Sequence, residues 1–86
     1  MNKQEIFQAI TLSLIGTIQH NIDCQSRLRD YCKGASEDQI VEAAISARVS
    51  RNCFLEAKKL CEDLGVEKEF LELVATLSEA NRKVEA

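Results

Sequence analysis

The chain has 86 residues, which is the length of a single domain. It contains no proline and three glycines, too few turn-forming residues for an all-β or multi-stranded α/β fold. Apolar residues at 45% and charged residues at 29% exclude a disordered chain, and a net charge of −3 argues against a dedicated nucleic-acid binder. We therefore expect an all-α fold, with residues 1–86 forming one small bundle of about four helices.

The first helix is predicted from about Lys3 to Asn21. Its apolar residues cover a broad arc of the helical wheel, to which Leu12 adds further surface. The members of this arc are Ile6, Phe7, Ile10, Leu14, Ile15, Ile18 and Ile22. A helix with so wide an apolar face needs cover on more than one side, and a chain this short has little cover to offer. We expect identical copies to share this face, so that the bundle is completed by oligomerisation.

The same apolar segment is not predicted to cross a membrane. It is interrupted by polar residues between Ile6 and Ile18, and it falls short of the roughly 20 residues that a span requires. Glu5 precedes it, and no cleavage site of the small-x-small type follows before Gln19, so a secretory signal is not expected. The sequence favours a cytoplasmic protein, in a compartment where thiols stay reduced.

The second helix is predicted from about Asp23 to Lys33. Asp23 is suited to cap its start, and Gly34 to end it in the left-handed conformation.

The third helix is predicted to begin after Ser36 and to end at Gly65. Ser36 and Gln39 have the spacing of a capping box, in which each side chain bonds the other residue's backbone N–H. Ser50–Asn52 marks the place where this helix is most easily broken. One face is apolar or small at every position: Ile40, Ala43, Ala47, Ser50, Phe54, Ala57, Cys61 and Leu64.

The fourth helix is predicted from about Glu67 to Lys83. Its apolar stripe consists of Val66, Phe70, Leu73, Val74, Leu77 and Ala80.

Four cysteines are the residues with the most chemical potential: Cys24, Cys32, Cys53 and Cys61. In a helical hairpin, Cys24 could face Cys61 while Cys32 faces Cys53, which resembles the disulfide-stapled twin-cysteine hairpins of the mitochondrial intermembrane space. Those proteins use nine or three intervening residues, whereas this chain has seven. No Cys-x-x-Cys pair exists, so no metal site is expected. Burial as small apolar side chains is the alternative, above all for Cys53 and Cys61.

Cys24 and His20 are the candidate catalytic residues. Cys24 lies at the predicted start of a helix, where the dipole lowers a thiol pKa, and Arg27 follows one turn later. His20, four residues before it, could act as a proton shuttle. The alternative for His20 is a favourable dipole partner at the end of the first helix.

Basic residues cluster at Arg27, Arg29 and Lys33, with Arg48 and Arg51 on the next helix. Aromatic residues are not interleaved with them, so ion pairs with nearby carboxylates explain this cluster as well as a nucleic-acid site does. No glycine-rich phosphate loop and no Ser-His-Asp pattern occurs, and no cofactor is expected.

The segment from Lys33 to Ala44 resembles the central signature of the carboxymuconolactone decarboxylase family, which includes alkyl hydroperoxidase D. Members commonly carry a cysteine-bearing helix, then Gly-Ala-Ser/Thr, polar residues, Ile and Glu-Ala, as in Gly34-Ala35-Ser36 and the residues that follow. The resemblance covers roughly residues 5 to 60 and implies an all-helical subunit that assembles into trimers or hexamers.

The sequence departs from the family at its catalytic motif. Redox-active members carry Cys-x-x-Cys and a nearby histidine, whereas this chain has Cys24 alone and Ser26 at the histidine position. Cys32 is eight residues from Cys24, about 12 Å along a helix, which is too far for a disulfide. The sequence therefore predicts a self-associating protein with an interaction or scaffold role, open to a protein partner. The alternatives are a peroxidase-like thiol oxidoreductase using Cys24 and a disulfide-stapled hairpin.

Overall fold

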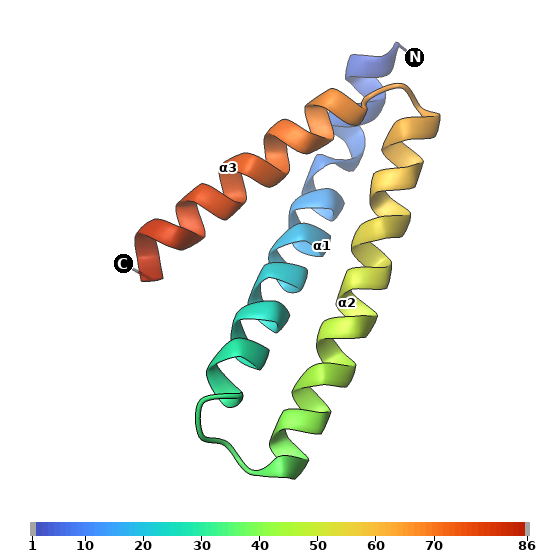
Figure 1. Ribbon diagram of the computed structural model, residues 1–86. Helices are drawn as coiled ribbons and strands as arrows, with labels where there is room; N and C mark the ends of the chain where they lie inside the picture. The colour runs from blue at the N-terminus through green and yellow to red at the C-terminus, as the bar shows by residue number, and fades with distance from the viewer. Residues whose placement is uncertain (1, 86) are drawn as a thin grey trace.

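The computed structural model describes residues 2–85, with the side chains of residues 2–82. Over these residues the chain forms three helices: α1 (Lys3–Tyr31), α2 (Glu37–Asp63) and α3 (Glu67–Glu85). α1 and α2 lie side by side as an antiparallel hairpin, and α3 crosses the N-terminal part of α1 before diverging from the hairpin (Figure 1). The all-α prediction is confirmed, but the expectation of about four helices is not.

The difference lies in α1, which unites the first two predicted helices. Asp23 does not cap a new helix; instead its carboxylate accepts a hydrogen bond of 2.9 Å from the Gln19 side chain one turn earlier. No proline or glycine interrupts the segment between these residues and Tyr31, so nothing in the backbone stops the helix there. His20 and Cys24 therefore lie inside a helix and not at its ends.

The ends of α2 follow the predicted local chemistry. The backbone N–H of Gln39 donates to Ser36 Oγ (3.3 Å), and the backbone N–H of Ser36 donates to Gln39 Oε1 (3.1 Å), which is the predicted capping box. Gly65 follows α2 with a φ of +76°, as expected of a glycine that ends a helix. Gly34 does not adopt the left-handed conformation, contrary to the prediction, and the residue that ends α1, Cys32, is in the right-handed region. The helix α2 continues through Ser50–Asn52 without a break.

The core lies where all three helices meet. Leu14 and Ile18 of α1, Cys61 of α2 and Phe70 of α3 are buried there, together with Val66 in the α2–α3 connection. The Phe54 and Phe70 rings contact each other with centroids 5.6 Å apart. We call this region, formed by residues 7–18, 54–66 and 70–77, the three-helix end.

The remaining part of the hairpin, residues 21–50, is narrower and is called the hairpin end. Here α1 packs against α2 through small buried residues, Ala43, Ala47 and Ser50, as their predicted stripe requires. The Gln25 side chain donates to the backbone carbonyl of Ala47 (3.1 Å), and Ser50 Oγ donates to Asn21 Oδ1 (3.3 Å). α3 diverges from this part of α2, so here α2 packs against α1 and not against α3 (Figure 1).

Candidate interaction surface

A row of aliphatic side chains lies exposed on α2. Val41, Ile45 and Val49 are 53%, 59% and 57% exposed, and Cys53, one turn further on, is also exposed. Residues four apart lie on the same face of a helix in successive turns, so these side chains form one continuous surface. We call Val41, Ile45, Val49 and Cys53 the outer strip of α2.

The outer strip faces away from α1. Ala43, Ala47 and Ser50 occupy the opposite side of the same helix and are 1–5% exposed. In an ordinary surface helix the larger apolar residues face the core and polar residues face water. At the hairpin end of α2 this order is reversed, because small residues are buried and larger β-branched residues are exposed. A row of exposed apolar side chains, unlike scattered single ones, is typical of an interaction surface.

The structure does not bear out the expectation of an unsheltered first helix. The seven residues of its predicted apolar arc are all buried or half-buried, because α2 and α3 cover α1 from two sides. Leu12, at 84% exposure, is the one large apolar side chain of α1 that is exposed among the described residues. The continuous row of exposed aliphatic side chains is instead on α2.

Sequence reasoning missed the outer strip because it followed one periodic stripe of α2. That stripe, from Ile40 to Leu64, is the buried face, and five of its members are Ala, Ser or Cys. The signal that could have revealed the strip is a second apolar row at intervals of four residues, beginning at Val41. Its β-branched residues are larger than the buried residues beside it.

Charged side chains flank the outer strip in two groups. Glu37, Asp38 and Glu42 precede its centre, whereas Arg48 and Arg51 follow it, and all five are exposed. None of the five forms an ion pair with another described side chain. Elsewhere, Lys33 lies 3.8 Å from Asp30 and Lys58 lies 3.7 Å from Glu62, as expected of charges on solvated helices.

The register of the hairpin separates the cysteines that the sequence could have paired. Because Gln25 contacts Ala47, Cys24 lies level with the middle of α2. Cys61 is fourteen residues beyond Ala47, about 21 Å along the helix. Cys24 and Cys61 are therefore too far apart to form a disulfide. The same register separates Cys32 from Cys53, and all four cysteines are free thiols.

Cys24 and His20 do lie together. The Cys24 sulfur is 3.7 Å from His20 Nε2 and 3.9 Å from Nδ1, which is within contact for a thiol and an imidazole. However, Cys24 is only 3% exposed, while His20 is exposed to solvent. The predicted helix start that would activate the thiol is also absent, because Cys24 lies within the continuous α1.

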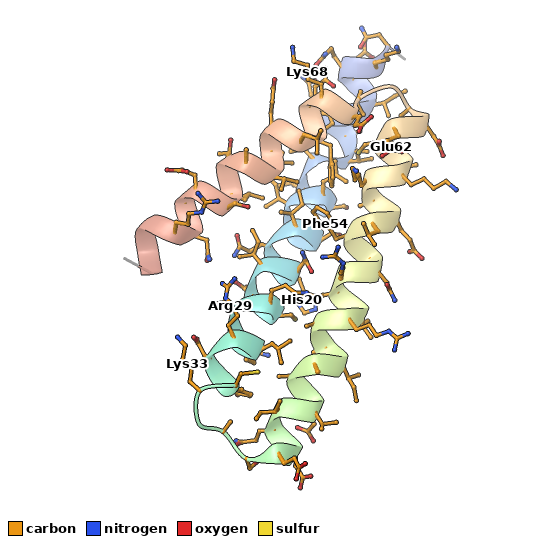
Figure 2. All side chains as sticks on the ribbon, viewed as in Figure 1. His20, Arg29, Lys33, Phe54, Glu62 and Lys68 are labelled. Atoms are coloured by element: carbon orange, nitrogen blue, oxygen red, sulfur yellow. The ribbon has the colours of Figure 1, made fainter. Side chains whose placement is uncertain are left out.

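His20 lies near the middle of the hairpin, whereas Arg29 and Lys33 lie nearer the turn (Figure 2).

The other buried thiol is a core residue. Cys61 is fully buried among Leu14, Ile18 and Phe70, as the prediction of a structural role required. Burial raises the pKa of the Cys61 thiol, because the apolar core disfavours the thiolate. Cys53, for which burial was also predicted, is exposed on the outer strip.

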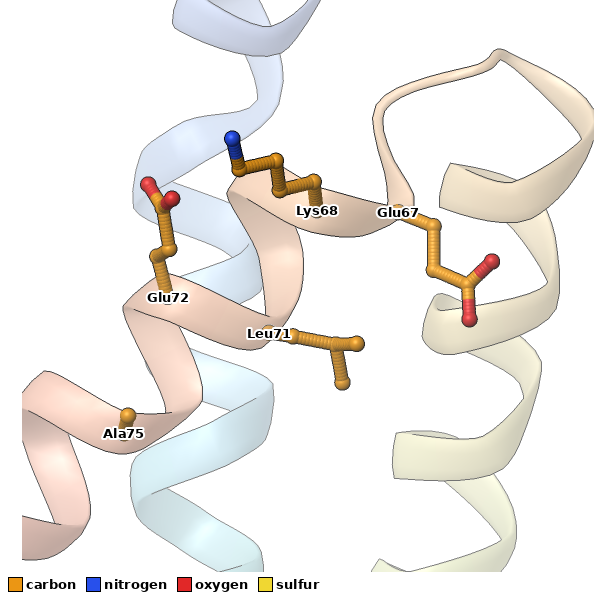
Figure 3. A pocket seen from close by; sticks show the side chains of 5 residues that line it. All are labelled: Glu67, Lys68, Leu71, Glu72 and Ala75. Atoms are coloured by element: carbon orange, nitrogen blue, oxygen red, sulfur yellow. The ribbon is translucent and has the colours of Figure 1, made fainter.

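Hollows with the volume of a small-molecule site lie on the surface, among them the following two. One, of about 510 Å³, is lined entirely by α3, with Leu71 between Glu67, Lys68, Glu72 and Ala75 (Figure 3). Because one helix supplies every lining residue, this hollow does not enclose a ligand as a binding site does. The other, of about 480 Å³, lies where α3 diverges from α1. Polar residues line it from both helices, including Asn21, Gln25 and Arg29 of α1 and Ser78 and Arg82 of α3.

The described residues offer no metal centre and no membrane span. Within residues 2–82, His, Cys, Asp and Glu side chains do not gather in groups of three or more that could hold a metal ion. None of the helices, over the part of the chain that is described, is long and apolar enough to traverse a bilayer.

No protein-family model, curated protein or solved structure matches this chain. The resemblance to the carboxymuconolactone decarboxylase family stays a prediction from the segment around Gly34-Ala35-Ser36.

Proposed function

We propose that this protein is a small helical interaction module that self-associates through the outer strip of α2. The observation that carries the proposal is the exposure of Val41, Ile45 and Val49, all above one half, in consecutive turns of one helix face. The proposal keeps the predicted self-association and interaction role, but it moves the contact from the first helix to α2.

Covering the strip is favourable because each aliphatic side chain is more than half exposed. Burial of apolar surface contributes about 25 cal/mol per Å². The exposed Val and Ile side chains of the strip carry no polar atom that would lose its hydration on burial. The strip is also rigid before binding, since α2 is one continuous helix held by α1 along its other face. A contact of one helix face is small, so we expect a dissociation constant in the micromolar range.

Size-exclusion chromatography with light scattering tests the proposal with one pair of variants. Ile45→Glu places a charge at the centre of the outer strip, and we expect it to reduce self-association at least tenfold because the carboxylate would be buried unpaired. Leu12→Glu is the matched control, because Leu12 is also exposed and apolar but lies on α1. It should leave association unchanged. A wild-type chain that stays at 9.6 kDa up to hundreds of micromolar would refute the proposal.

The control also tests the original expectation from the sequence. If Leu12→Glu abolishes association and Ile45→Glu does not, the contact lies on α1 and not on the outer strip. Circular dichroism of both variants should match the wild type, because both positions are exposed.

A thiol-dependent activity is the second candidate, and the 3.7 Å contact between Cys24 and His20 is the observation that favours it. In such a role, the Cys24 thiolate would attack one peroxide oxygen while the O–O bond breaks, which leaves the sulfur as the sulfenic acid. His20 would take the thiol proton and return it to the departing hydroxide or alkoxide. The burial of Cys24 opposes this role, because the peroxide must reach the sulfur.

Mass spectrometry of the peroxide-treated protein distinguishes the two candidates. A thiol enzyme requires rapid addition of one oxygen at Cys24, lost in Cys24→Ser and slowed in His20→Ala. An interaction module predicts that Cys32, which is exposed and lies outside the outer strip, is oxidised before Cys24. Oxidation of Cys24 ahead of Cys32 would support the enzyme.

A further inference from the structure

We infer that the occupant of the outer strip is a second copy of this chain running antiparallel to the first, with Ile45 at the two-fold axis. The inference rests on the proposed function and specifies its partner, orientation and register. It is carried by the arrangement of charges on either side of the strip.

The apolar residues fix the centre of the contact. Val41 and Val49 lie four residues before and after Ile45, so the three aliphatic residues of the strip are symmetric in both residue type and spacing about that position, while Cys53 lies level with Glu37 of the partner. A two-fold contact requires that, if one residue meets a second, the second meets the first in return. An antiparallel pair centred on Ile45 satisfies this, because Ile45 meets its own copy and Val41 lies level with Val49 of the partner.

The charges select the antiparallel direction. Measured around the helix axis from Ile45 at about 100° per residue, Glu37, Arg48 and Arg51 lie about 80°, 60° and 120° to one side, whereas Asp38 and Glu42 lie about 20° and 60° to the other. In an antiparallel pair related by a two-fold axis, each flank faces the same flank of the partner. Glu37 of one copy then lies within about two residues, or 3 Å along the axis, of the level of Arg51 in the other. Two such pairs form in one dimer.

A parallel pair lacks this complementarity. In that direction each flank faces the opposite flank at the same level, so Glu37 approaches Asp38 and Glu42 of the partner. Three carboxylates from each copy would then gather at one end of the contact, which like-charge repulsion disfavours. The two arginines would meet no carboxylate from these groups, so the antiparallel direction is favoured.

Oxidative cross-linking tests the inference in the full chain. Cys32→Ser and Cys53→Ser first remove the two exposed thiols, and single cysteines are then introduced as Ile45→Cys, Val41→Cys or Val49→Cys. We expect Ile45→Cys to form a covalent dimer on mild oxidation. Val41→Cys and Val49→Cys should each fail alone, because two copies of either position lie about 12 Å apart in the antiparallel pair. A mixture of these two variants should give the mixed dimer.

Each outcome has a separate meaning for the two proposals. Cross-linking of Val41→Cys and Val49→Cys each with itself would show a parallel pair, which overturns the inference and leaves self-association intact. A dimer in solution that cross-links through none of the three positions overturns the inference and, if Ile45→Glu also has no effect, the outer strip as well. A wild-type chain that is monomeric overturns both.

A charge exchange gives an independent readout of direction. Arg51→Glu should weaken the dimer about three- to tenfold, because Glu37 of the partner would face a like charge. Combining it with Glu37→Arg should restore most of the affinity in an antiparallel pair. If the double variant is weaker than either single one, Glu37 and Arg51 do not meet across the interface.

Discussion

The two ends of this molecule differ in how many helices cover α2. At the three-helix end, α2 contributes Phe54, Ala57 and Cys61 to a core shared with α1 and α3. At the hairpin end the same helix has α1 as its neighbour, and Val41, Ile45 and Val49 form a row that is more than half exposed, whereas Leu55 and Leu60 at the three-helix end are less than half exposed. A helix with one neighbour can bury one row of side chains, so the outer row stays exposed in the single chain.

The largest expected effect is a loss of stability when the core of the three-helix end is disrupted. Phe70→Ala at the three-helix end should lower the free energy of unfolding by about 3–5 kcal/mol, because it leaves a cavity beside Phe54 where no solvent enters. Urea unfolding followed by circular dichroism measures the change. Leu71→Ala, at a neighbouring position that is 46% exposed, is the control and should cost less than about 1 kcal/mol. Similar costs at both positions would contradict the assignment of the core.

A smaller effect is expected from enlarging a buried residue at the hairpin end. Ala47→Leu should lower the free energy of unfolding by about 1–3 kcal/mol, because α1 packs closely over Ala47 and Gln25 bonds its carbonyl. Ile45→Leu changes the outward side of the same turn and should be near neutral in the monomer. If Ala47→Leu is as stable as the wild type, α1 and α2 are not in close contact there.

The smallest effect concerns pH and the buried Cys61. Burial raises the pKa of this thiol, so above the ordinary thiol value near 8.5 the unfolded chain releases a proton that the folded chain keeps. The free energy of unfolding should therefore decline as pH rises above about 8.5. Cys61→Ala removes this dependence while costing stability at every pH through the cavity it leaves. An unchanged pH profile in Cys61→Ala would mean that other groups cause the decline.

Much of the fold was predictable because its signals are local. The capping box of Ser36 and Gln39, the stop at Gly65 and the stripe from Ala43 to Cys61 each depend on residues within a few turns of one another. The join between the first two helices was not predictable from Asp23, because an aspartate can cap a helix or bond a glutamine one turn back. Local sequence does not decide between these two roles.

The candidate site was less predictable because it depends on which faces remain uncovered. The contact between Cys24 and His20 follows from their spacing of four, but the burial of Cys24 depends on the register between α1 and α2. The exposure of the outer strip likewise depends on which rows of α2 pack against the other helices. A wide apolar arc on α1 was in turn covered by two helices of its own chain.

Isotope-filtered NOE spectroscopy tests the central claim most directly. A sample mixed from labelled and unlabelled chains reports only contacts between copies, and the methyl groups of Val41, Ile45 and Val49 are well suited to this measurement. We predict intermolecular NOEs from Ile45 to its own copy and between Val41 and Val49. Intermolecular NOEs confined to Leu12, or none at concentrations of hundreds of micromolar, would contradict the assignment of the outer strip as the surface that the copies share.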